Sequence, residues 1–128
     1  MLFAQNISDY KWENRLIFLV DEEPETSIMN SQLKILEAKS DELKERDIMV
    51  FQLTPKTILL SNGEETRLSS IETYRSLAIP TDFKGIILVG KDGGVKLKKP
   101  YIVPVANIFT LIDGMPMRKS EIKRKKEG

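Results

Sequence analysis

The chain has 128 residues, of which 41% are hydrophobic and 30% are charged. This length fits one domain, because globular domains most often have about 100–150 residues, and the composition is typical of a folded, soluble protein. The sequence contains no cysteine and no histidine, which excludes thiol redox chemistry, thiol nucleophiles, histidine general bases and the usual zinc sites. An enzyme with this sequence would have to use carboxylate, lysine, tyrosine or serine side chains. The alternative is a protein that binds a partner without catalysis.

Charge is unevenly distributed along the chain. The net charge is +1, but residues 118–128 contain six Lys or Arg and two Glu, so this segment carries +4 and residues 1–117 carry −3. We therefore expect a domain over 1–117 and a basic, solvated tail over 118–128. The sequence has no apolar run of about 18 residues, so no membrane insertion is expected, and residues 1–15 lack the apolar segment of a signal peptide.

The first half of the chain predicts a strand, a helix and a second strand. Residues 16–20 form a continuous apolar run, which is typical of a strand buried on both faces. Apolar residues then recur at helical spacing over 26–46. The acidic residues of 21–25 precede this helix, where the helix dipole favours them. Residues 48–53 form the second apolar run and predict the second strand.

The middle of the chain predicts a turn and a helix. Over 54–68 the pattern is weak, and Asn62-Gly63 indicates a small hairpin or a surface turn. Ser69 and Glu72 have the spacing of a capping box, which predicts the start of a helix. Pro80 is expected to end that helix.

The last third predicts a strand, a hairpin and a helix. Residues 86–89 form a third buried strand. The Asp92-Gly93-Gly94 sequence indicates a turn into residues 95–98, whose alternation is typical of an edge strand with one solvated face. A final helix is expected over 105–113, with Gly114 in the position of a C-terminal cap.

This order of elements predicts an α/β protein. Strand, helix, strand, helix, strand, strand and helix give a thioredoxin-like three-layer fold, in which a central mixed sheet of four to five strands is flanked by helices. A flavodoxin-like fold is the alternative, but it would need more parallel strands and no closing hairpin.

Three segments resemble a thioredoxin/peroxiredoxin-like family known as domain of unknown function 4174. They are YKWENRL at 10–16, LVGKDGGVK at 88–96 and IDGMPMR at 112–118. The resemblance implies a thioredoxin-like fold but no known activity. Relatives occur as exported bacterial proteins and as modules of animal extracellular-matrix proteins, so it also implies a periplasmic or extracellular setting.

In thioredoxin-like enzymes the working thiol lies just after the first core strand, at the N-terminus of the next helix. The corresponding positions here are 21–26, and none of them is a cysteine. The cis-proline that precedes the third strand in such enzymes would align near Gly85 and is absent as well. We therefore expect neither peroxidase nor disulfide-exchange activity.

The end of the sheet that carries the thiol in such enzymes is the predicted binding surface. It comprises loop 21–26, segment 81–85 and the lysine-bearing hairpin. The candidate residues are Asp21, Glu22, Glu23, Glu25, Thr26, Lys91, Lys96, Lys98 and Lys99. The acidic spacing matches no EF-hand and residues 90–94 lack the order of a phosphate-binding loop, so we expect no metal and no cofactor.

Two kinds of function fit this surface. The first is a non-catalytic module that binds a protein or an anionic polymer; few aromatic residues accompany the lysines, so a specific nucleic-acid partner is not expected. The second is a cysteine-free enzyme that uses carboxylate, Lys or Tyr groups. A deep pocket at 21–26 with convergent polar groups of shifted pKa would favour the enzyme. The sequence leaves the oligomeric state open.

Three further features carry local predictions. Trp12 is expected to pack over one end of the sheet, and Met115 and Met117 to cover the end of the last helix; the alternative is an exposed recognition patch. Arg15 stands at the entrance of the first strand. We expect it to pair with a nearby acid such as Asp9 or Glu13.

Overall fold

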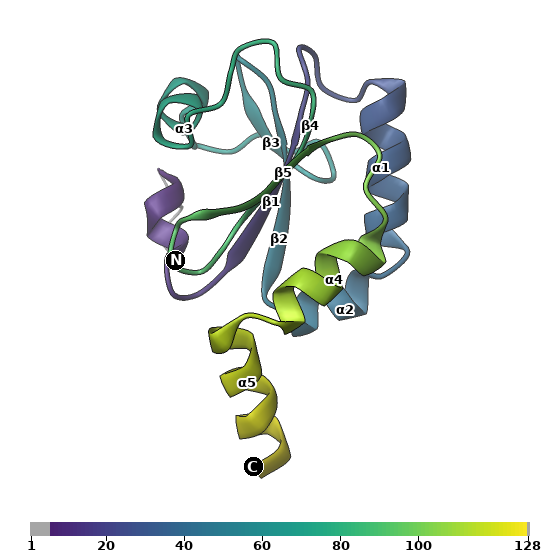
Figure 1. The fold of residues 1–128 in the computed structure, drawn as a ribbon. Coiled ribbons are helices and arrows are strands. Elements are labelled where there is room, and N and C mark those ends of the chain that lie inside the picture. The colour runs from purple at the N-terminus through teal and green to yellow at the C-terminus, as the bar shows by residue number, and fades with distance from the viewer. Residues whose placement is uncertain (1–5, 128) are drawn as a thin grey trace.

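The structure is a computed structural model that describes residues 6–127 (Figure 1). Five strands form one mixed sheet in the order β3-β2-β1-β4-β5. The strands are β1 (Arg15–Val20), β2 (Ile48–Leu53), β3 (Ile58–Leu60), β4 (Gly85–Val89) and β5 (Val95–Pro100). The helices are the 3₁₀ helix η1 (Ile7–Tyr10), α1 (Ser27–Glu37), α2 (Ser40–Glu45), α3 (Ser70–Ser76), α4 (Val105–Asp113) and α5 (Pro116–Glu127).

Strand β1 is the centre of the sheet. It pairs in parallel with β2 and antiparallel with β4, and each of its six residues is buried. This explains the unbroken apolar run in its sequence, because a central strand covered on both faces has no solvated side. The antiparallel β4 and β5 distinguish the sheet from that of the flavodoxin-like alternative.

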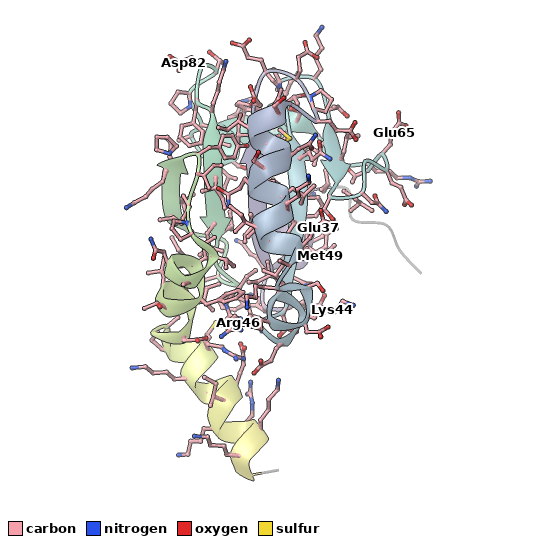
Figure 2. The ribbon with its side chains drawn as sticks, turned by 90° about the vertical axis from the view of Figure 1, so that its right-hand side faces the viewer. Glu37, Lys44, Arg46, Met49, Glu65 and Asp82 are labelled. Atoms are coloured by element: carbon pink, nitrogen blue, oxygen red, sulfur yellow. The ribbon has the colours of Figure 1, made fainter. Side chains whose placement is uncertain are left out.

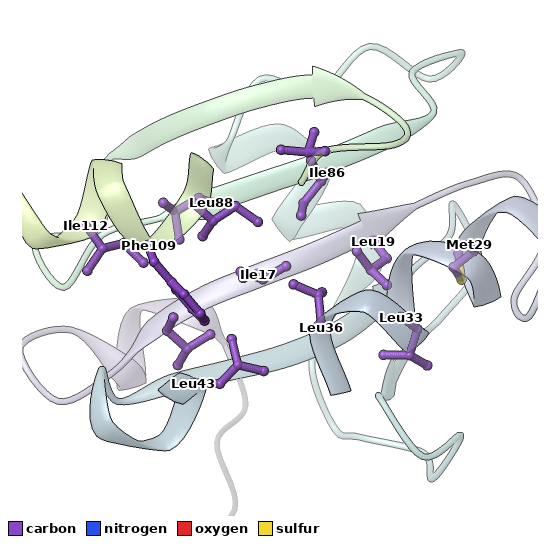
Figure 3. Packing of buried hydrophobic residues seen from close by; sticks show 13 residues of the cluster. Ile17, Leu19, Met29, Leu33, Leu36, Leu43, Ile86, Leu88, Phe109 and Ile112 are labelled. Carbon is purple, nitrogen blue, oxygen red and sulfur yellow. The ribbon is translucent and has the colours of Figure 1, made fainter. Parts of the chain in front are cut away.

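Helices cover both faces of the sheet. Ile17 and Leu19 of β1 point into a cluster with side chains of α1, α2 and α4, and Figure 3 shows this cluster converging on β1 and β4. Leu16, Phe18 and Val20 point to the other face, where they pack with residues of η1 and α3. The predicted three-layer architecture is confirmed, and the structure adds η1, α2, β3 and α5 to the predicted order of strands and helices.

Two predicted helices differ in extent. The helix expected over 26–46 is two helices, because the backbone leaves the helical conformation at Lys39 and α2 starts again with acidic residues in its first turn, where the helix dipole favours them. Helix α3 starts as predicted, with Ser69 accepting a hydrogen bond from the Glu72 backbone N–H. It ends at Ser76, before Pro80, because Ala78 has a φ of 53°.

The turns and the chain end follow from local sequence. Gly63, with a φ of 91°, turns the chain so that Leu59 pairs with Glu65. Of the two predicted alternatives, a small hairpin or a surface turn, the structure has the small hairpin. Gly93, with a φ of 87°, forms the turn between β4 and β5. Beyond α4, the segment expected to be a solvated tail forms helix α5. Within residues 6–127, no helix is long and apolar enough to span a membrane.

Candidate functional site

The two ends of the sheet have different chemistry. We call the end with loop 21–26, segment 81–85 and Lys98 and Lys99 the Asp21 end. We call the opposite end, from which α5 extends, the Glu121 end. Figure 2 shows Asp82 at the Asp21 end and Arg46 and Lys44 at the Glu121 end. Because β4 runs antiparallel to β1, its turn at 90–94 lies at the Glu121 end.

At the Asp21 end, the loop between β1 and α1 satisfies its own polar groups. The buried Asp21 carboxylate accepts hydrogen bonds of 2.7 Å from the Glu22 backbone N–H and the Thr26 hydroxyl. Thr26 in turn accepts from the Met29 backbone N–H and caps α1. Gln52 of β2 accepts from the Glu25 backbone N–H at 3.0 Å. The loop expected to correspond to the thiol position of thioredoxin-like enzymes therefore holds a hydrogen-bond network of its own.

Two tyrosines stand near this network, and both are unsuited to act as bases. Burial raises the pKa of Tyr101, and the negative charge of Asp21 raises it further. Burial and then Asp21 raise the pKa of Tyr74 in the same way. The Tyr101 hydroxyl donates to the Val20 carbonyl at 3.0 Å. Both phenols are therefore neutral near pH 7, and an enzyme with a tyrosinate at this end is not favoured.

The Asp21 end brings together only some of the candidate lysines. Lys98 lies 5.3 Å from the centre of the Phe83 ring. Lys99 is on the exposed edge strand β5, where its backbone pairs with that of Ile86 on β4. Lys84, which was not among the candidates, lies 3.9 Å from a carboxylate oxygen of Asp21. This end therefore carries both signs of charge. Among residues 6–127, no group of three acidic side chains is arranged as a metal site.

The other two candidate lysines lie at the Glu121 end. Lys96 forms a 2.8 Å ion pair with Asp92. The buried Lys91 forms 2.8 Å ion pairs with Asp47 and Glu121. The single surface predicted from sequence is thus divided between the two ends, and Lys91 has a role within the fold.

Glu121 of α5 is the centre of a buried ion cluster. Arg15, only 1% exposed, binds both of its carboxylate oxygens at 3.2 Å, and Lys91 binds it at 2.8 Å. The expected pairing of Arg15 with Asp9 or Glu13 is therefore wrong. Its partner is 106 residues away in the sequence, and only the docking of α5 brings the two together.

A second set of ion pairs joins α5 to α4 and to the end of α2. Arg118, 2% exposed, binds Asp113 at 3.2 Å and Glu45 at 2.9 Å. Arg46 also binds Asp113, at 2.8 Å, and its guanidinium lies 4.2 Å from the centre of the Phe109 ring. The first turns of α5 are therefore anchored mainly by charge.

The carboxyl groups of both sets are held in their charged form. Burial acts to raise the pKa of Glu121, but hydrogen bonds from Arg15 and Lys91 outweigh it, and the pKa is lowered. Hydrogen bonding from Arg46 is the main cause that lowers the pKa of Asp113. These groups are therefore charged near neutral pH, and their ion pairs stabilise the attachment of α5.

Two local predictions at this end need correction. Trp12 does not pack over the end of the sheet but is 65% exposed. The neighbouring Tyr10 packs on one face of the sheet, with its ring 5.9 Å from that of Phe51. Met115 packs against the core as expected, but Met117 is 38% exposed.

The sequence matches the family model of a domain of unknown function, DUF4174, over residues 6–121. The chain belongs to this family. The matched region includes Arg15, Lys91, Arg118 and Glu121, so the ion cluster lies within the DUF4174 domain. None of the curated proteins matches the sequence.

Solved structures show which fold the DUF4174 domain has. The structure is similar to thioredoxin peroxidase I of Plasmodium yoelii, with a TM-score of 0.59 and 19% identity over 89% of this chain and 79% of that chain. It is similar to the reduced 2-Cys peroxiredoxin of Plasmodium vivax, with a TM-score of 0.58 and 13% identity over 89% and 84%. It is also similar to a yeast mitochondrial 1-Cys peroxiredoxin, with a TM-score of 0.56 and 10% identity over 88% of this chain and 68% of that chain. The fold is therefore thioredoxin-like, as predicted.

Proposed function

We propose that this DUF4174 domain is a redox-inactive, thioredoxin-like module that acts by binding an anionic polymer, with α5 as the principal contact. The similar peroxiredoxins are named for their cysteines, and this chain has none. The loop at the corresponding end is closed by its own hydrogen bonds. Both observations favour binding over catalysis.

The observation that carries the proposal is the charge and attachment of α5. The segment 116–127 contains six Lys or Arg and two Glu, and the helix extends beyond the sheet (Figure 1). Arg118 and Glu121 fix its first turns to the domain, whereas Lys119 and Lys126 are exposed. A basic helix held in one orientation offers a polyanion a preformed row of charges, which lowers the entropic cost of binding.

A comparison of two charge-matched variants tests this proposal. The K119Q/K126Q variant removes two charges from α5, and the K98Q/K99Q variant removes two from β5 at the Asp21 end. On a heparin column at low salt, we expect the first variant to elute at clearly lower salt than the wild type, and the second to elute close to it. The opposite order would place the contact on β5, and no retention of the wild type above a neutral protein would refute polymer binding.

The absence of redox chemistry has its own test. We expect no turnover in peroxidase and insulin-reduction assays, because the chain has no thiol. The same preparation should be folded by circular dichroism. Activity above the buffer rate would show that a group other than a thiol performs the reaction, and would favour the cysteine-free enzyme.

A further inference from the structure

A surface hollow at the Glu121 end lies between the β4–β5 turn and the junction of α4 and α5. Its volume is about 230 Å³. Its lining combines three cationic side chains and one acidic side chain with an apolar wall: Arg15, Lys91, Lys96, Asp92, Gly90, Met115, Pro116 and Met117. The hollow is separate from the exposed lysines proposed to contact a polymer, so an inference about it does not rest on that proposal.

Arg15 supplies a buried hydrogen-bond donor that lacks a partner. Its two terminal nitrogens bind Glu121 and the Arg46 carbonyl. Its Nε–H has no hydrogen-bond partner among residues 6–127. A buried donor left unsatisfied costs about 1–3 kcal/mol, and more when it is charged. Arg15 lines the hollow, so a ligand whose acceptor reaches this nitrogen from the hollow would remove that cost.

The N-terminus of α5 adds further donors on the same wall. Pro116 is the first residue of α5 and lines the hollow together with Met117. Pro116 has no N–H and the Lys119 N–H donates to the Met115 carbonyl, so the first-turn donors without a partner within the helix are the N–H groups of Met117 and Arg118. The helix dipole gives this end a partial positive charge. Asp92, the acidic residue of the lining, is already bound by Lys96 and by the Gly94 backbone N–H. The hollow therefore offers donors to an anion.

The apolar wall indicates that the anion carries an apolar group. Met115, Pro116 and Met117 form this wall, and methionine side chains adapt their shape to what they contact. An inorganic anion would leave the wall in water. A cavity of about 150 Å³ is large enough for benzene, so this hollow has room for an apolar group of that size together with a carboxylate.

We propose that this hollow binds a small organic acid, a carboxylate that bears an apolar group of about six carbons. The carboxylate accepts hydrogen bonds from Arg15 Nε–H and from the first-turn N–H groups of α5. The apolar group lies against Met115 and Met117. Lys91 and Lys96 line the hollow within ion pairs to Asp47, Glu121 and Asp92, so the preference for an acid over an amine comes from the unpaired N–H donors, which an amine would not satisfy.

An amide NMR titration of the full chain with sodium hexanoate tests the proposal. We expect saturable shifts confined to residues 90–96 and 115–119. Sodium acetate has the charge without the apolar group, and hexan-1-ol has the apolar group without the charge, so each should bind at least about tenfold more weakly. No saturable shift with millimolar hexanoate would overturn the proposal, as would equal affinity for either control compound.

Two matched variants separate this site from the rest of the surface. Met117 and Ile71 are both exposed and are the second residues of α5 and α3, so the M117E and I71E variants place a carboxylate at the same position of two helices. M117E should weaken hexanoate binding at least about tenfold, and I71E less than about twofold. Equal effects of the two variants would overturn the proposal.

The variant K96Q keeps the proposal testable if M117E fails to fold by circular dichroism. Lys96 lies on the exposed edge strand, and its substitution leaves the buried ion cluster intact. We expect K96Q to bind hexanoate severalfold more weakly than the wild type. Unchanged affinity would overturn the role of the cationic lining.

Discussion

Glu121 is the residue on which the attachment of α5 depends. Its carboxylate binds Arg15 and Lys91, both buried. The variant E121Q removes the negative charge and leaves two buried cations with Asp47 as their one acidic partner among the described residues. We expect it to lower the free energy of unfolding by about 3 kcal/mol, measured by urea denaturation, because a broken buried ion pair leaves uncompensated charge.

The matched control for E121Q is E37Q, since Glu37 is an exposed residue of α1 (Figure 2). It should change the free energy of unfolding by less than about 0.5 kcal/mol. Equal stability of the two variants would show that Glu121 does not anchor α5.

The same carboxylates predict a loss of stability in acid. The pKa values of Glu121, Asp113 and Glu45 are lowered in the folded protein, so the folded state binds fewer protons than the unfolded state. Their contribution is complete above the unfolded pKa values of about 4 and is lost as the pH falls through the lower folded values. Urea denaturation should give a constant free energy of unfolding above about pH 5 and a decrease below about pH 4. A rise in stability on acidification would contradict this.

At the scale of elements, α5 is part of the folded domain mainly through its first turns, since beyond them Lys125 forms a longer, exposed ion pair of 3.8 Å with Glu45. Deletion of 119–128 removes Glu121, and we expect it to lower the melting temperature by about 10 °C or more, because buried Arg15 and Lys91 lose their shared partner. Deletion of 123–128 removes the exposed residues 123–126 and the chain end and should change it by less than about 3 °C. Differential scanning calorimetry measures both. Equal melting temperatures of the two deletion variants would mean that residues 119–122, including Glu121, are dispensable for folding.

The pairing of β4 with β5 depends on a glycine at one position. A Cβ atom at Gly85 would overlap the Lys99 carbonyl oxygen across the strand pair. We expect G85A to lower the free energy of unfolding by about 1–3 kcal/mol. At Gly114, with an ordinary φ of −82°, a Cβ would meet no atom closer than 3.6 Å, so G114A should be neutral or slightly stabilising. Chemical denaturation compares the two, and equal losses would refute the steric explanation.

Sequence patterns predicted elements well where one local rule decides them. The apolar runs predicted β1, β2 and β4, and Ser69 predicted the start of α3. The patterns failed where distant residues decide. Arg15 meets Glu121, 106 residues away, and no local pattern indicates that pair. The candidate surface was divided for the same reason, because the antiparallel direction of β4 places Lys91 at the opposite end from Asp21.

At the scale of the whole molecule, the two ends of the sheet have separate tasks in this proposal. The Asp21 end has the position of a redox site but holds a closed network of hydrogen bonds. The Glu121 end holds the basic helix and the hollow beside it. The ion pairs of Glu121 and Arg118 attach α5 to the rest of this end and determine its orientation. The fold therefore positions the basic helix mainly by charge.

The last prediction concerns how binding to a polyanion depends on salt. Each cation that contacts a linear polyanion releases counterions, so the logarithm of the binding constant falls linearly with the logarithm of the salt concentration, by about 0.7–0.9 per contact for nucleic acids. If Lys119 and Lys126 both contact heparin, the K119Q/K126Q variant should bind with a slope shallower by about 1.5, whereas K98Q/K99Q should keep the wild-type slope. Calorimetric titrations between about 50 and 200 mM salt measure this difference. Weaker binding by K119Q/K126Q at an unchanged slope would show that the two lysines act on the protein's structure and do not contact the polymer.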